Sequence, residues 1–69
     1  MQVEISTQTC DMGINEYFKG HISDKTLAYL NRRGLTTVRD FIQVCNELPK
    51  KVSIEAKAYL MFGMENFYN

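Results

Sequence analysis

The sequence ISDKTLAYLNRRGLTTVRDF, residues 22–41, holds the clearest helix start and stop signals in this chain. Ser23 is a favourable N-cap, because its hydroxyl can accept a hydrogen bond from the free amides of a first helical turn. Gly34 stands where a helix ends in a left-handed residue, a conformation that glycine adopts more easily than other residues. The sequence therefore predicts a helix over residues 24–33.

A second helix is predicted to follow the first closely, with Thr36 or Thr37 as its N-cap. Asp40 lies three residues past Thr37, from where its carboxylate can bond back to the cap amide. This helix stops before Pro49, because proline disfavours helical geometry in the residue before it. The two helices are expected to meet at a tight corner around Gly34.

Further helices are expected on both sides of this corner. The first is predicted over residues 12–19, where Asp11 is placed to cap the first turn and Gly20 to close the last. The final helix is predicted to follow Ser53, a further N-cap, and to end at Gly63. The expected fold class is all-α, a compact bundle of about four short helices.

The length and composition of the chain allow one domain with one modest core. The chain has 69 residues, of which 45% are hydrophobic and 23% charged, a balance typical of globular proteins. Residues 1–10 hold Val3 and Ile5 among polar neighbours, which favours a loose N-terminal arm. Residues 11–69 are predicted to form the single helical domain, as a monomer or a weak dimer.

Residues suited to catalysis or metal binding are sparse in this sequence. His21 has no Cys or acidic residue at metal-ligand spacing, so a surface or capping role is favoured. Cys10 and Cys45 are far apart and are expected to be buried thiols in a reducing cytoplasm. We therefore expect a module that is not an enzyme and uses no metal or other cofactor. No uncharged stretch approaches the roughly 20 residues of a membrane helix, so a membrane is not an expected partner. Because the sequence offers no catalytic constellation, a small-molecule substrate is not expected either.

Charge is unevenly distributed along the chain, although the formal net charge is zero. All eight Lys and Arg residues lie between positions 19 and 57, and this span carries only four of the eight acidic residues. A positive middle with acidic flanks would attract an anionic partner. The alternative is that these basic residues only solvate the outer faces of helices.

The pattern of residues 22–41 resembles the C-terminal domain of the α subunit of bacterial RNA polymerase. The resemblance implies a compact, SAM-like bundle of short helices with helix-hairpin-helix character, which grips the DNA minor groove and receives transcription activators. The match runs without a gap over about a third of the chain, at Ser23, Leu30, Gly34, Leu35, Thr37, Val38 and Phe41.

The resemblance weakens at the positions that contact DNA in that family. Lys25 stands at the position of the family's arginine, but its ammonium group lacks the planar geometry of a guanidinium. Ala28 stands at the position of the family's asparagine and has no hydrogen-bonding side chain. A glycine-lysine-serine turn near the end of the family's domain corresponds to residues 48–52 here. In this segment Pro49 replaces the glycine and Val52 the serine, whereas Lys51 keeps the family's lysine. The stretch that joins this turn to residues 22–41 is also about seven residues shorter than the corresponding stretch in the family. The resemblance therefore implies the fold more strongly than the DNA contacts.

Two functional hypotheses follow from these features. In the first, the chain is a nucleic-acid-binding, transcription-associated module that contacts DNA phosphates with little sequence readout. Its candidate contacts are the basic residues Lys25, Arg32, Arg33, Lys50, Lys51 and Lys57.

The alternative hypothesis is a protein-interaction module, an adaptor or regulator of the transcription machinery that keeps the fold and has lost the DNA contacts. Neutral net charge and the changed DNA-contact positions favour it. Exposed aromatic side chains would then be the anchors, although aromatics at helical spacing more often belong to the core. The candidates for such anchors are Tyr17, Tyr29, Tyr59, Phe67 and Tyr68.

Overall fold

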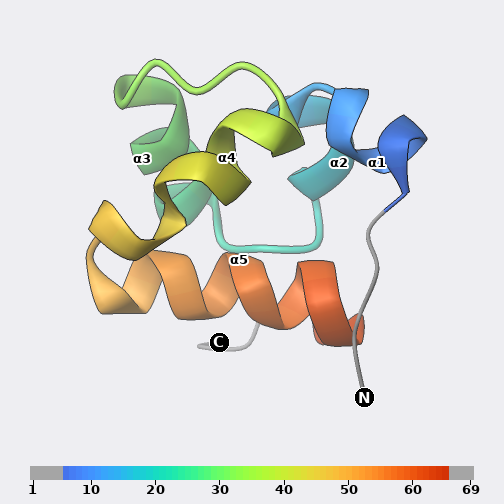
Figure 1. Cartoon of the computed structure of the whole chain (residues 1–69). Helices are drawn as coiled ribbons and strands as arrows, with labels where there is room; N and C mark the ends of the chain where they lie inside the picture. Colours follow the sequence, from blue (N-terminus) through green and yellow to red (C-terminus); the bar gives the residue numbers. More distant parts are fainter. Residues whose placement is uncertain (1–5, 66–69) are drawn as a thin grey trace.

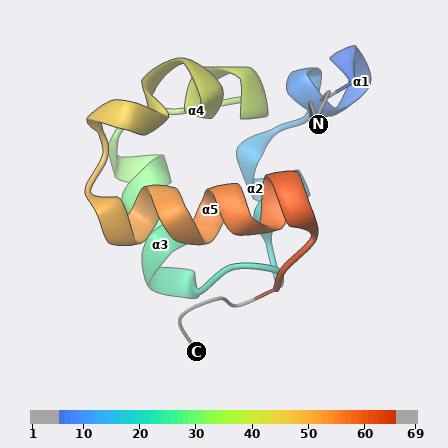
Figure 2. The same ribbon diagram turned by 60° about the horizontal axis from the view of Figure 1, so that its bottom comes forward.

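Five α-helices and one 3-10 helix make up most of residues 6–65, the part of the chain that the computed structural model describes. These residues contain no named strand, so the predicted all-α fold class is confirmed. Figure 1 shows α5 (Lys50–Phe62) along the bottom of the view with the other helices above it, and Figure 2 brings α5 forward. In chain order the elements are α1 (Thr7–Asp11), α2 (Ile14–Phe18), α3 (Asp24–Arg32), α4 (Val38–Val44), η1 (Cys45–Glu47) and α5 (Lys50–Phe62).

The tight corner after α3 forms at Gly34, as the sequence predicts. Gly34 adopts a left-handed backbone with φ of 81°. Its amide donates to the carbonyl oxygen of Asn31 at 3.0 Å, and the amide of Leu35 donates to that of Leu30 at 3.3 Å. This pair of bonds is a Schellman motif, which satisfies carbonyl groups that the end of a helix leaves without partners.

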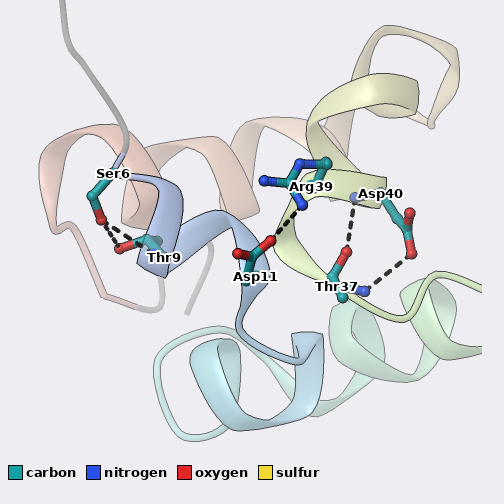
Figure 3. Close-up of polar contacts among 6 residues, drawn as sticks. All are labelled: Ser6, Thr9, Asp11, Thr37, Arg39 and Asp40. Carbon is teal, nitrogen blue, oxygen red and sulfur yellow. Dashed lines mark hydrogen bonds and ion pairs between the residues drawn. The ribbon is translucent and has the colours of Figure 1, made fainter.

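Thr37, rather than Thr36, is the N-cap of α4, and it forms a capping box with Asp40 (Figure 3). The Thr37 hydroxyl accepts from the Asp40 amide at 3.3 Å, and the Asp40 carboxylate accepts from the Thr37 amide at 3.1 Å. The amide of Thr36 donates to the same carboxylate at 3.0 Å. The hydrogen bond from the Thr36 amide, which has the largest effect, and that from the Thr37 amide hold the pKa of Asp40 below its ordinary value of 3.8.

The end of the predicted N-terminal arm folds into α1. Ser6 caps this helix by accepting from the amide of Thr9 at 3.1 Å, and α1 packs against α4. Asp11 forms an ion pair with Arg39 of α4 (Figure 3), so it does not cap the next helix. Residues 7–10 of the predicted loose arm are therefore helical, and residues 1–5 lie outside the described part of the chain.

Helix α2 is shorter than the predicted helix over 12–19. The amide of Ile14 donates to the carbonyl oxygen of Thr36 at 2.9 Å, and the amide of Val38 donates to that of Met12 at 3.0 Å. These bonds pair the two chain segments as an isolated antiparallel bridge. Because this tertiary pairing requires extended backbone just before Ile14, the helix begins later than local sequence signals indicate.

Helix α5 begins at Lys50, directly after Pro49, and the predicted cap at Ser53 is wrong. Proline suits the start of a helix, because the amide that it lacks would have no partner within the helix there. Ser53 is buried inside the helix, where its hydroxyl donates to the carbonyl oxygen of Lys50 at 3.3 Å. The predicted end of the helix is confirmed, since Gly63 closes α5 with φ of 68°.

The core is built mainly from α2, α3, α4 and α5. The rings of Phe18 and Phe41 meet edge to face with their centroids 5.7 Å apart, a favoured geometry for aromatic pairs. Ala56 brings α5 into the same cluster. The residues of this cluster that are fully buried are Ile14, Phe18, Leu30, Val38, Phe41 and Ala56.

Neither cysteine is among the buried residues of this core, although Cys45 packs against it. Cys10 lies in α1 and Cys45 begins η1, two short segments that contain no buried residue. Both thiols are half-buried, so the prediction that they are buried is wrong.

Replacing Gly34 with Ala should lower the free energy of unfolding by about 1–2 kcal/mol, because a Cβ atom disfavours left-handed backbone. Asn tolerates this conformation better, so Gly34→Asn should cost less. Urea unfolding of the two variants and the wild type measures both effects. An equal loss for Ala and Asn would show that backbone conformation is not what Gly34 supplies.

The capping box predicts a pH-dependent contribution to stability. Because folding lowers the pKa of Asp40, its contribution is present at neutral pH and is lost as the pH falls through the lowered value. Asp40→Ala should therefore be less stable than the wild type at pH 7, and the difference should shrink as the pH falls below 3.8. Urea unfolding at several pH values tests this, and a difference that does not change with pH would contradict it.

Candidate functional site

A cleft between α3 and α5 brings together three of the six basic residues predicted to contact phosphate. Lys25 and Arg32 come from α3, and Lys51 comes from α5. The cleft has a volume of about 440 Å³ and is partly open to solvent. Its lining residues are Ser23, Lys25, Thr26, Tyr29, Arg32, Lys51, Val52 and Glu55.

One face of α3 supplies a wall of this cleft. Lys25, Tyr29 and Arg32 share that face, because positions i, i+4 and i+7 of a helix align. The two cations are exposed, whereas Tyr29 is half-buried against the core. The guanidinium carbon of Arg32 lies 5.9 Å from the centroid of the Tyr29 ring, within range of a cation–π contact. The wall therefore carries a planar cation close to an aromatic ring.

A buried carboxyl group joins the two helices beneath the cleft. Glu55 of α5 is only 2% exposed. It accepts hydrogen bonds from the Ser23 amide at 2.6 Å, from the Ser23 hydroxyl at 3.1 Å and from the Thr26 hydroxyl. A carboxyl group withdrawn from water needs such donors, since burial without partners is costly. Glu55 thereby holds the first turn of α3 against α5.

No sequence feature marks Glu55 as part of a site, because its partners Ser23 and Thr26 lie 32 and 29 residues away along the chain. The position of Tyr29 beside the cations, in contrast, could have been predicted from the sequence. The spacing of Lys25, Tyr29 and Arg32 is visible in the sequence and would have placed the three on one helical face.

The start of α5 adds positive potential to the cleft. Lys50 and Lys51 are the first two residues of this helix, and its first turn contains no acidic residue. The N-terminus of a helix carries partial positive charge and amide donors that lack partners within the helix. Lysines in this turn raise the potential further, so the mouth of the cleft favours an anion.

The other three predicted contacts lie elsewhere. Arg33 is the exposed C-cap residue of α3, and Lys50 is exposed beside Lys51, but neither lines the cleft. Lys57 is half-buried farther along α5, where its ammonium group donates to the side-chain oxygen of Asn46 at 3.5 Å. The six predicted residues therefore do not form a single site.

A second, apolar hollow of about 260 Å³ lies on the outer face of the C-terminal half of α5. Phe62 is 70% exposed there, which makes it the most exposed large hydrophobic residue of the described chain. Its lining residues are Ile54, Lys57, Ala58, Met61, Phe62 and Met64. Large apolar side chains grouped on a surface are a feature of protein contact sites.

Three of the five aromatic residues predicted as possible anchors do not lie in this hollow. Tyr17, Tyr29 and Tyr59 are half-buried and pack against the core. Burial, with nearby Tyr59, raises the pKa of Tyr17 above its ordinary value of 10.0. Phe67 and Tyr68 lie outside the described residues.

His21 takes part in a local cluster on the loop between α2 and α3. Its ring stacks on that of Tyr59, with centroids 4.5 Å apart and planes at 8°, and its Nδ1 atom contacts the Glu65 carboxylate. Over residues 6–65, no three His, Cys, Asp or Glu side chains are grouped in a way that would hold a metal ion.

Comparisons of this chain with models of known protein families, with curated proteins and with solved structures found no match. None of the helices within the described residues has the length and apolar character needed to cross a bilayer.

Replacing Glu55 with Gln should lower the free energy of unfolding by about 1–3 kcal/mol, because an amide cannot accept all the hydrogen bonds that converge on the carboxyl oxygens. Glu47→Gln, a change of the same type at an exposed residue of η1, is the control and should have little effect. Urea unfolding of both variants measures the difference. Equal stability of the two variants would show that Glu55 does not join α3 to α5 energetically.

Proposed function

We propose that this chain is a non-enzymatic module that binds nucleic acid through its phosphate backbone, with the cleft between α3 and α5 as the contact surface. The observation that carries this proposal is the convergence of Lys25, Arg32 and Lys51, from two helices, on one partly open cleft. Three cations at one place, beside the N-terminus of α5, form a surface suited to phosphate groups.

The resemblance to the RNA polymerase domain supports the same surface and an association with transcription. Lys25 and Lys51 stand at two positions that contact DNA in that family, and both line the cleft. Ala28, at a third such position, is exposed but does not line it. A site that keeps the cations and lacks the asparagine would hold phosphates and read little sequence.

The cleft residues also favour backbone contacts over base-specific contacts to a duplex. The hydroxyl groups of Ser23 and Thr26 are engaged with Glu55, so they are not available to read base edges. Arg32 has a planar guanidinium, but this group lies near the Tyr29 ring, so we do not count it among the groups that read base edges of a duplex. The charged groups at the mouth of the cleft are therefore the main contacts expected for a duplex.

Contact with a protein of the transcription machinery is the second candidate, and the apolar hollow on α5 favours it. The two candidates use different residues, because Phe62 and Met61 line the hollow and not the cleft. Phe62→Ser removes the most exposed apolar group without touching the buried core. This variant should keep the DNA affinity of the wild type if the cleft is the DNA-binding surface.

Fluorescence anisotropy with a labelled 12-base-pair duplex at low salt tests the proposed function. Non-specific binding with a dissociation constant of roughly 1–100 µM is expected, with the logarithm of the affinity falling linearly with that of the salt concentration. The triple variant Lys25→Gln, Arg32→Gln, Lys51→Gln should lose most of the affinity. Each lost phosphate contact should reduce the slope by roughly 0.9.

Lys19→Gln is the matched control, because Lys19 is an exposed lysine at the end of α2 that does not line the cleft. It should change the slope by much less than any one of the three cleft substitutions. The proposed function is rejected if the wild type fails to bind duplex or single-stranded DNA at about 100 µM protein, the weak end of non-specific binding.

A further inference from the structure

We propose that the cleft receives one unpaired nucleotide, with its base against the Arg32 and Tyr29 side chains and its phosphate at the rim beside Lys25 and Lys51. This inference rests on the proposed function and deepens it, because it specifies the form of nucleic acid that the site prefers. Three features support it: the shape of the cleft, the chemistry of its wall on α3, and the hydrogen bonds that Glu55 already forms within the protein.

The shape of the cleft is suited to a group that enters it. Contacts to the backbone of a duplex require only cations on an outward surface. The hollow here has about 440 Å³, which falls within the range of sites that enclose small ligands. A single nucleotide is a group of that class, whereas a paired base is held inside its duplex.

The wall on α3 offers a surface on which a base can stack. The Arg32 guanidinium and the Tyr29 ring lie 5.9 Å apart, measured from the guanidinium carbon to the ring centroid. Unpaired bases stack on aromatic rings and on guanidinium planes in proteins that bind single strands. On α5, the half-buried side chain of Val52 adds an apolar contact to the lining.

The floor of the cleft sets the orientation of the nucleotide. Glu55 lies there, and its carboxyl oxygens already accept from Ser23 and Thr26. A phosphate placed against this acidic floor would gain no donor from those groups. The exposed lysines Lys25 and Lys51 instead place the favourable positive charge at the rim. The base therefore points inward and the sugar-phosphate backbone follows the rim.

A duplex can fill this site only by releasing a base from its stack, which costs a few kcal/mol. The cleft should therefore discriminate between strands with and without accessible bases. This discrimination separates the inference from simple phosphate attraction, which depends on the number of charges alone.

Anisotropy titrations of the full chain with three labelled probes test the inference: octadeoxyadenylate, an octamer of the same phosphates with abasic sugars, and an eight-base-pair duplex. Octadeoxyadenylate should bind at least about fivefold more tightly than the abasic octamer, as expected for stacking of one base. It should also bind more tightly than the duplex. Tyr29→Leu, which keeps an apolar group against the core, should reduce or remove the preference for octadeoxyadenylate over the abasic octamer.

Arg32→Lys keeps the charge and removes the planar group, so it provides a second test that does not depend on core packing at Tyr29. It should weaken binding of octadeoxyadenylate by a larger factor than binding of the abasic octamer, because the planar group is lost while the charge is kept. Equal affinity for octadeoxyadenylate and the abasic octamer, or tighter binding of the duplex, overturns the nucleotide site and leaves the proposed function standing. Absence of binding to all three probes overturns both.

Discussion

The hydrogen bonds between Glu55 and the first turn of α3 determine how the two helices of the cleft are placed. Glu55 accepts from the backbone amide and the hydroxyl of Ser23 and from the hydroxyl of Thr26. Ser23 is at the same time the N-cap of α3, so one residue starts the helix and attaches it to α5. A buried carboxyl group accepts only a narrow set of donor positions, since each lost bond leaves a polar group unsatisfied. The cleft is therefore held by a polar contact as well as by the apolar core.

The helix starts and stops that depend on neighbouring residues could be predicted from the sequence. Gly34, Ser23 and the Thr37 capping box all act within a few residues of their own position, so the corner between α3 and α4 is encoded locally. The start of α2 could not be predicted in this way, because it depends on the pairing of Ile14 with Thr36. Local sequence preference therefore indicates that a helix forms in this region, whereas the tertiary contact determines the residue at which α2 begins.

The candidate site could be predicted only in part, for the same physical reason. The lysines and arginines are visible as a positive span, and Lys25 and Lys51 stand at positions marked by the family resemblance. Which cations share a surface depends on the packing of α3 against α5, and this excludes Arg33, Lys50 and Lys57 from the cleft. In the sequence Glu55 looks like an ordinary acidic residue of a helix, because none of the residues near it in the chain indicates that its side chain is buried.

We propose that nucleic acid binds at the cleft between α3 and α5, and not at the apolar hollow on α5. The most direct measurement is an amide chemical-shift titration of the labelled protein with short DNA at low salt. The signals of Lys25, Tyr29, Arg32 and Lys51 are expected to shift together and to saturate together. Shifts centred on Met61 and Phe62, or shifts spread evenly over all basic residues, would contradict it.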